Sequence, residues 1–250
     1  MDGAEEDGWS AVAAEWSDLW AASAAPAHDA LIAASGIRAG SRVLDVGCGS
    51  GEFLGTLERL GATGAGVDPA PGMVALARAT APLADIRVGG AESLPWPDGS
   101  FDVVVAINAL QFAEDTVEAL AEFRRVLVPG GLVAVANWAE GARNDLDAIE
   151  EAVAAADGEE AGPDGDLRVA GGLEEVLVES GLEVVTAGLV EVPWTAADDE
   201  TLVRGVLLGA DPETKRELAP AVLAAAARFR SGDGYMLHNA YRFAVARRPD

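Results

Sequence analysis

The chain has 250 residues, half of them hydrophobic, which is enough for one large domain or for one domain with a cap. Its formal net charge of −25 makes the surface strongly acidic, and such a surface repels phosphate backbones and anionic lipids, so we expect neither nucleic acid nor a membrane as a partner. The single cysteine excludes an internal disulfide and fits a cytoplasmic location, and with only two histidines beside it the sequence offers no obvious metal site.

Residues 1–36 predict a helical lid. Residues 1–8 are acidic, contain glycine and lack large apolar groups, so we expect them to be disordered. They also lack the basic and apolar regions of a signal peptide. Trp9, Trp16 and Trp20 follow at spacings of seven and four, which places them on one face of a helix. That face either packs onto the core sheet or covers an organic substrate, and the sequence leaves both interpretations open.

A glycine-rich turn, residues 47–51, joins the first predicted strand to a helix. Its three glycines let a ligand approach the backbone and meet the free N–H groups at the start of that helix. The dinucleotide fingerprint needs a further glycine where Glu52 stands, and no Lys-Ser/Thr pair follows as it would in a P-loop. Asp45 and Glu52 instead flank the turn with negative charge, which suits a ligand that carries an amino group or a sulfonium.

Asp68 ends the second predicted strand, Thr63–Val67, about twenty positions after the glycine turn. An acidic residue at this place can accept hydrogen bonds from both ribose hydroxyls of a nucleotide. A turn and helix then run from Pro69 and carry Met73 near the start. The pattern therefore predicts a nucleotide-like ligand across the first two strands.

Two strongly apolar runs, Phe101–Ile107 and Leu132–Trp138, predict further strands. The first is nearly continuous and rich in β-branched residues, which is typical of a buried parallel strand. Ligands of open α/β sheets bind outside the carboxyl ends of the strands. Asn108 and Gln111 follow the first run and Trp138 ends the second, so we expect all three at the ligand edge.

The glycine turn closely resembles motif I of the class I S-adenosylmethionine (SAM) dependent methyltransferases. The loop Ala91–Pro97 and the segment Arg124–Gly131 resemble two further segments of the small-molecule members of that family (methyltransferase domain 11/25-like). The resemblance implies a Rossmann-like α/β fold: a seven-stranded sheet with helices on both faces and an antiparallel last strand. It also implies SAM, or its product S-adenosylhomocysteine (SAH), as the cofactor.

By that resemblance, the turn backbone packs against the amino-acid end of SAM and Met73 packs on the adenine, with Met73 as core filler the open alternative. The family's acidic residue for the adenine amino group is Gly90 here, which leaves the N–H of Ala91 or the carboxylate of Glu92 to read the adenine edge. The implied cofactor site consists of Asp45, Gly47, Cys48, Gly49, Asp68, Pro69, Met73, Ala91, Glu92 and Asn108.

We expect the core to span residues 37–192 and a cap to follow it. A helix over Asp145–Ala156 and a mobile loop belong to that core in this interpretation. About forty residues, 193–234, then precede the last strand, and we expect them to form helices that cap the substrate pocket, because structureless inserts of that length are rare. Residues 235–250 return to the core and supply its final strand, Ala240–Arg247.

The resemblance implies methyl transfer from SAM to an O, N or C nucleophile of a small organic acceptor, such as a natural-product intermediate. The protein must align the two partners and exclude water. A base is needed only where the acceptor loses a proton, and the only histidines, His28 and His238, are candidates, with a structural role as the alternative. The predicted substrate wall consists of Trp16, Trp20, Gln111 and Trp138.

Two other functions fit the same motifs. One is an enzyme that keeps SAM or SAH as a scaffold and catalyses a cyclisation or rearrangement. The other is a SAM-binding protein without catalysis. The glycine turn and Asp68 predict binding in all three cases, because the chemistry is decided by the pocket and not by the fold.

Overall fold

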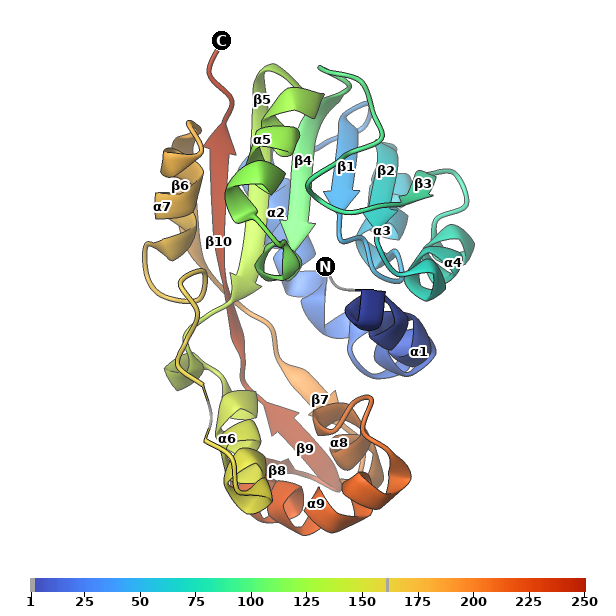
Figure 1. The fold of residues 1–250 in the computed structure, drawn as a ribbon, viewed down its shortest axis with the longest axis vertical. Helices are drawn as coiled ribbons and strands as arrows, with labels where there is room; N and C mark the ends of the chain where they lie inside the picture. Colours follow the sequence, from blue (N-terminus) through green and yellow to red (C-terminus); the bar gives the residue numbers. More distant parts are fainter. Residues whose placement is uncertain (1–2, 161) are drawn as a thin grey trace.

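A seven-stranded sheet forms the upper part of the molecule in Figure 1, in the order β3-β2-β1-β4-β5-β10-β6. The computed structural model describes residues 3–160 and 162–250. Strands β1 to β5 run parallel, while β10 is antiparallel to both β5 and β6. The strands of this sheet are β1 (Arg42–Val46), β2 (Thr63–Asp68), β3 (Asp85–Val88), β4 (Phe101–Ile107), β5 (Leu127–Trp138), β6 (Glu183–Glu191) and β10 (Ala240–Arg247). The predicted fold, including the antiparallel last strand, is confirmed.

Helices cover both faces of the sheet. Those of the core are α2 (Ala25–Ser35), α3 (Glu52–Leu60), α4 (Pro71–Thr80), α5 (Thr116–Val126) and α7 (Gly172–Glu179). Val103 and Val105 of β4 pack on the side of α2, α3 and α4, whereas Val104 packs on the side of α5 and α7. Burial on both faces explains the unbroken apolar run of this strand. Within the described part of the chain, no helix is both long and apolar enough to cross a membrane.

Helix α1 (Gly3–Leu19) packs against α4 beside the carboxyl edge of the sheet (Figure 1). The N–H of Gly72 donates to Oγ of Ser10 at 3.1 Å, and a Cβ on Gly72 would stand 2.7 Å from the Ser10 carbonyl oxygen, so the two helices meet backbone to backbone. The expectation of disorder was wrong for residues 3–8, which are helical, and residues 1–2 lie outside the described part. The short helix η1 (Ala21–Ala24) connects α1 to α2.

A cap lies beyond the carboxyl edge of the sheet (Figure 1). Its helices are α6 (Asp145–Asp157), α8 (Asp199–Val206) and α9 (Pro212–Ala226). Its strands form a small antiparallel sheet in the order β7-β9-β8 and are β7 (Trp194–Ala196), β8 (Arg230–Ser231) and β9 (Gly234–Leu237). The cap has an apolar core of its own, built around Ile149, Trp194, Leu202 and Val222.

The cap contains more than the helices that the sequence predicted. Its three strands are only two to four residues long, too short to produce a recognisable alternation. Residues 235–237, included from sequence in the core segment 235–250, belong to β9 of the cap, whereas β10 has the bounds predicted for the final strand, Ala240–Arg247. Helix α6, assigned to the core from sequence, packs against α9 because Leu146 and Ile149 join the apolar core of the cap.

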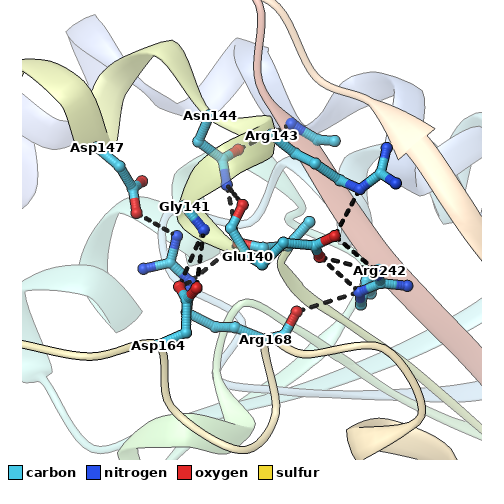
Figure 2. Close-up of polar contacts among 10 residues, drawn as sticks. Glu140, Gly141, Arg143, Asn144, Asp147, Asp164, Arg168 and Arg242 are labelled. Carbon is cyan, nitrogen blue, oxygen red and sulfur yellow. Dashed lines mark hydrogen bonds and ion pairs between the residues drawn. The ribbon is translucent and has the colours of Figure 1, made fainter.

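A polar cluster joins the core to the cap where the chain leaves β5 (Figure 2). The carboxylate of Glu140 accepts from Nε of Arg143 at 2.7 Å and from Nε of Arg242 at 2.9 Å. Arg168, on the loop that leads to α7, donates from Nη2 to Oδ2 of Asp147 at 2.6 Å. Its Nε donates to the carbonyl oxygen of Ala139 at 3.0 Å, so the loop is held against both the end of β5 and the start of α6.

Candidate functional site

A cavity of about 420 Å³, called the main cavity here, lies between the carboxyl edge of the sheet, helix α1 and the cap. It brings together most of the residues that the sequence singled out. Those that line it are Trp16, Trp20, His28, Asp45, Gly47, Cys48, Gly49, Asp68, Pro69, Met73, Asn108, Gln111 and Trp138. The glycine turn and the predicted substrate wall therefore share one cavity.

The glycine turn is held against β2 by hydrogen bonds of its own backbone. The N–H groups of Gly47 and Cys48 donate to the carbonyl oxygen of Val67 at 2.8 and 3.0 Å, and the N–H of Gly49 donates to Oδ2 of Asp68 at 2.9 Å. Gly49 has a φ of +51°, a left-handed conformation that favours glycine. The path of the turn is thus fixed by the protein itself.

Asp68 is buried at the end of β2, with both carboxylate oxygens engaged. Oδ1 accepts from the N–H of Ala70 at 2.9 Å and Oδ2 accepts from that of Gly49. Burial raises the pKa of Asp68 above its ordinary value, although these two hydrogen bonds act in the opposite direction. Each carboxylate oxygen has a second lone pair, so Asp68 is still able to accept from a ligand in the cavity.

Asp45 makes the turn a poor place for an anion. It is 3% exposed, and burial, followed by the charges of Asp68 and Glu52, raises its pKa to about 8. The thiol of Cys48 is buried as well, and burial raises its pKa, so it stays protonated and serves as a small wall residue. A cationic ligand group would relieve the repulsion among these carboxyl groups.

We expect Gly49→Val to weaken SAH binding by at least about tenfold. A side chain in the left-handed region costs about 1–2 kcal/mol, and adopting another conformation would move the Gly49 N–H away from Asp68. Gly130→Val is the matched control, because Gly130 also has a positive φ, +73°, with no atom within 4 Å of a Cβ, and it lies outside the main cavity. Calorimetry on both variants decides: a normal affinity in Gly49→Val would mean that the turn does not cradle the ligand.

Asn108 and Gln111 form a hydrogen-bonded pair at the end of β4. Nε2 of Gln111 donates to the carbonyl oxygen and to Oδ1 of Asn108, at 3.1 and 3.0 Å. Asn108 has a φ of +51°, the only positive value for a non-glycine residue in the described chain. Such strain is retained where the surrounding structure enforces it, and it is common at binding sites. The two residues therefore form a preset polar corner of the main cavity.

Aromatic rings form the side of the main cavity that faces the cap. Trp138 meets Trp20 edge to face at a centroid distance of 6.3 Å and meets Tyr241 in the same way at 4.8 Å. Tyr241 is buried, and burial raises its pKa, so its hydroxyl stays protonated. The sequence interpretation missed Tyr241, because its place at the cavity follows only from the pairing of β10 with β5.

Two ionisable side chains that could take up a proton, His28 and Glu150, line the main cavity. His28 is 6% exposed, and burial lowers its pKa to about 4, so the imidazole is neutral near pH 7. Glu150, on α6, was missed from sequence, because nothing in its helix showed that α6 covers the pocket. Although the Glu150 residue keeps contact with solvent, burial of its carboxyl group raises its pKa, and Asp147 raises it further.

Comparison with known proteins identifies the family. The model of a family described as "Methyltransferase domain" matches residues 44–135. The chain is 38% identical over 104 residues to the malonyl-[acyl-carrier protein] O-methyltransferase of Yersinia pestis, which is 42% of this chain and 39% of that protein. The chain contains a class I methyltransferase domain. The family recognised from the glycine turn is therefore confirmed, while the match spans less than half of the relative's length.

Solved structures share the fold of this methyltransferase domain well beyond the matched residues. A candidate methyltransferase from Bacillus halodurans C-125 has a TM-score of 0.63 at 19% identity, covering 89% of this chain and 99% of that one. The [4+2]-cyclase SpnF has a TM-score of 0.59 at 23% identity, covering 89% of this chain and 80% of that one. The methyltransferase fold thus occurs in a protein named as a cyclase, so the fold does not determine the reaction.

Three residues predicted from the methyltransferase resemblance or as bases lie outside the main cavity. Glu92 accepts at Oε1 from the N–H of Glu114 at 2.8 Å, which ties its loop to the approach of α5, and Ala91 is half-buried beside it. Their contact with adenine stays a prediction. His238 follows β9 outside the main cavity, where its backbone N–H donates to Oδ2 of Asp145 at 2.8 Å, and its part in catalysis stays a prediction.

Proposed function

We propose that this protein transfers a methyl group from SAM to an oxygen, nitrogen or carbon nucleophile of a small, largely apolar acceptor. The observation that supports this most is the main cavity, in which the glycine turn and Asp68 share a space with the aromatic wall. In this proposal residues 1–36 act as the lid, residues 193–234 together with α6 cap the acceptor, and the sheet with its helices holds SAM.

The residues at the glycine turn fit SAM in charge and in shape. The nearest atom to a Cβ on Gly49 would be a ring carbon of Trp16 at 3.8 Å, so the ligand side of the turn is open up to the lid. Asp68 would accept from the ribose hydroxyls, and Asp45 would face the amino group of the methionine part. SAM, when bound, supplies a methyl group already activated by its sulfonium.

The acceptor would lie between the turn and the cap. Trp20, Trp138 and Tyr241 offer it an apolar wall that excludes water. His28 and Glu150 are the candidate proton acceptors. A base works best when its pKa approaches the working pH, so the raised pKa of Glu150 favours it, whereas the pKa of about 4 makes the neutral imidazole of His28 a weaker base. The Yersinia pestis relative is named for O-methyl transfer, so a hydroxyl or carboxyl oxygen is the first acceptor atom to test.

We expect SAH binding at pH 7 to release a proton from Asp45. With a pKa of about 8 in the free protein, Asp45 is mostly protonated at pH 7, and the ammonium group of SAH would favour the ionised form. SAH affinity should therefore rise with pH up to about 8 and then level off. Calorimetry in two buffers of different ionisation enthalpy measures the proton, and Asp45→Asn should abolish both the release and the pH dependence. An equally strong pH dependence in Asp45→Asn would assign the proton elsewhere.

The reaction itself is tested by incubating the protein with methyl-labelled SAM and a panel of small phenols, carboxylic acids and amines. We expect a labelled, methylated product together with one equivalent of SAH, detected by mass spectrometry. A product of unchanged mass formed only when SAM or SAH is present would instead identify a scaffolded rearrangement. Tight SAH binding with no product from any acceptor of the panel or from a cell extract would favour a binding protein.

A further inference from the structure

A second cavity, of about 860 Å³, lies on the α7 side of β5. Its wall consists of the end of β5, the start of α5, helix α7 and residues 165–172, a segment called the strap here. Gln111 and Trp138 line both this strap cavity and the main cavity, so the two meet at the carboxyl edge of the sheet. The residues of the strap and of α7 that line this cavity belong to none of the methyltransferase motifs.

Asn137 lies in the wall of the strap cavity with its amide oxygen unpartnered. The residue is 1% exposed, and its Oδ1 has no hydrogen-bond partner among the described residues. Val133 and Val135, which precede it on the same face of β5, pack into the apolar core, so an apolar residue would have continued that pattern. Burying an unpaired amide oxygen costs free energy, and in native proteins such an atom requires an explanation. A ligand that donates a hydrogen bond supplies one.

The charges around the strap cavity define the ligand further. Asp166, Glu175 and Glu179 line it, and among the described residues of its wall Arg168 carries the only positive charge. The Arg168 guanidinium is already neutralised, because Nη2 donates to Asp147 at 2.6 Å and Nε lies 3.4 Å from Oδ1 of Asp164 (Figure 2). The strap cavity is therefore net negative, with a buried acceptor oxygen in its wall.

We propose that the strap cavity binds a protonated amino group of the methyl acceptor, with Asn137 accepting its hydrogen bond and the strap and α7 carboxylates balancing its charge. The acceptor then spans both cavities past Trp138, with its apolar part on the aromatic wall and its amine beneath the strap. The identification of this ligand as the methyl acceptor rests on the proposed methyl transfer, but the amine site itself does not depend on that proposal.

The amine site is tested by calorimetry with three probes of one shape: phenethylamine, 2-phenylethanol and phenylacetate. We expect the wild-type protein to bind phenethylamine at least about tenfold more tightly than phenylacetate. Asn137→Leu, which keeps the branching and the number of heavy atoms of the side chain, should weaken phenethylamine binding by about tenfold, and Asn137→Asp should strengthen it. Glu175→Gln with Glu179→Gln should also weaken it, whereas Glu183→Gln with Glu191→Gln, on exposed positions outside the cavity, is the matched control.

Two controls keep the amine site separate from the SAM site. Asp68→Ala, which alters the main cavity, should leave phenethylamine binding unchanged, and Asn137→Leu should leave SAH binding unchanged. Equal binding of phenethylamine and phenylacetate, or an unaltered affinity in Asn137→Leu, would overturn the proposal. Failure of the protein to methylate any acceptor would reject the proposed function alone, since the probe measurements stand without it.

Discussion

Asp68→Ala is expected to weaken SAH binding by about a hundredfold or more. In the proposed complex Asp68 accepts from two ribose hydroxyls, and a hydrogen bond to a charged group contributes about 1.5–3 kcal/mol. Losing both hydrogen bonds should therefore weaken the binding free energy by about 3 kcal/mol or more, which is about two powers of ten in affinity. The same change frees the N–H groups of Gly49 and Ala70, so the glycine turn loses its anchor as well. Isothermal titration calorimetry measures the result.

Two further variants show whether the loss comes from the carboxylate at this position. Asp68→Asn keeps one acceptor oxygen without the charge, so we expect an affinity between those of the wild type and Asp68→Ala. Asp102→Ala removes a carboxylate that pairs with Arg42 at 2.6 Å outside the main cavity, so SAH binding should not change. If Asp68→Ala bound SAH as the wild type does, the ribose assignment would be rejected.

The parts of the site that could be predicted are those encoded by short local patterns. The glycine turn and Asp68 lie at the ends of adjacent parallel strands, and strand ends meet at one edge of such a sheet. Asn108 and Trp138 follow the same rule, because β4 and β5 are also neighbours in the sheet. One fold rule therefore placed all of these residues in the main cavity.

The parts that could not be predicted depend on tertiary packing. Glu150 reaches the main cavity only because α6 packs on α9, a contact between two helices that lie far apart in the sequence and share no motif. Asn137 is one residue before Trp138, and alternation along β5 puts the two side chains on opposite faces, so only the strap and α7 reveal its cavity. His238 shows the converse, because a chemically suitable residue lies outside the main cavity.

The variants Trp20→Ala and Trp16→Ala are expected to distinguish core packing from lid function. The sequence could not distinguish these two roles, because both tryptophans lie on the same face of the predicted helix. Trp20 is buried, stacks on Trp194 at a centroid distance of 4.3 Å, and donates from Nε1 to the carbonyl oxygen of Gly205 at 3.1 Å. Its loss opens a cavity between α1 and the cap, so Trp20→Ala should lower the free energy of unfolding by about 3–5 kcal/mol. Urea denaturation followed by circular dichroism measures this loss.

Trp16 is half-buried and lies over Gly49, where it lines the main cavity. Trp16→Ala should therefore change stability far less than Trp20→Ala, but it should lower SAH formation with acceptor by tenfold or more, because water enters beside the turn. Deleting residues 1–20 would remove both side chains and expose Trp194, so a truncation alone cannot distinguish the two roles. Full turnover by Trp16→Ala would show that α1 is no lid, and wild-type stability of Trp20→Ala would show that the cap does not depend on it.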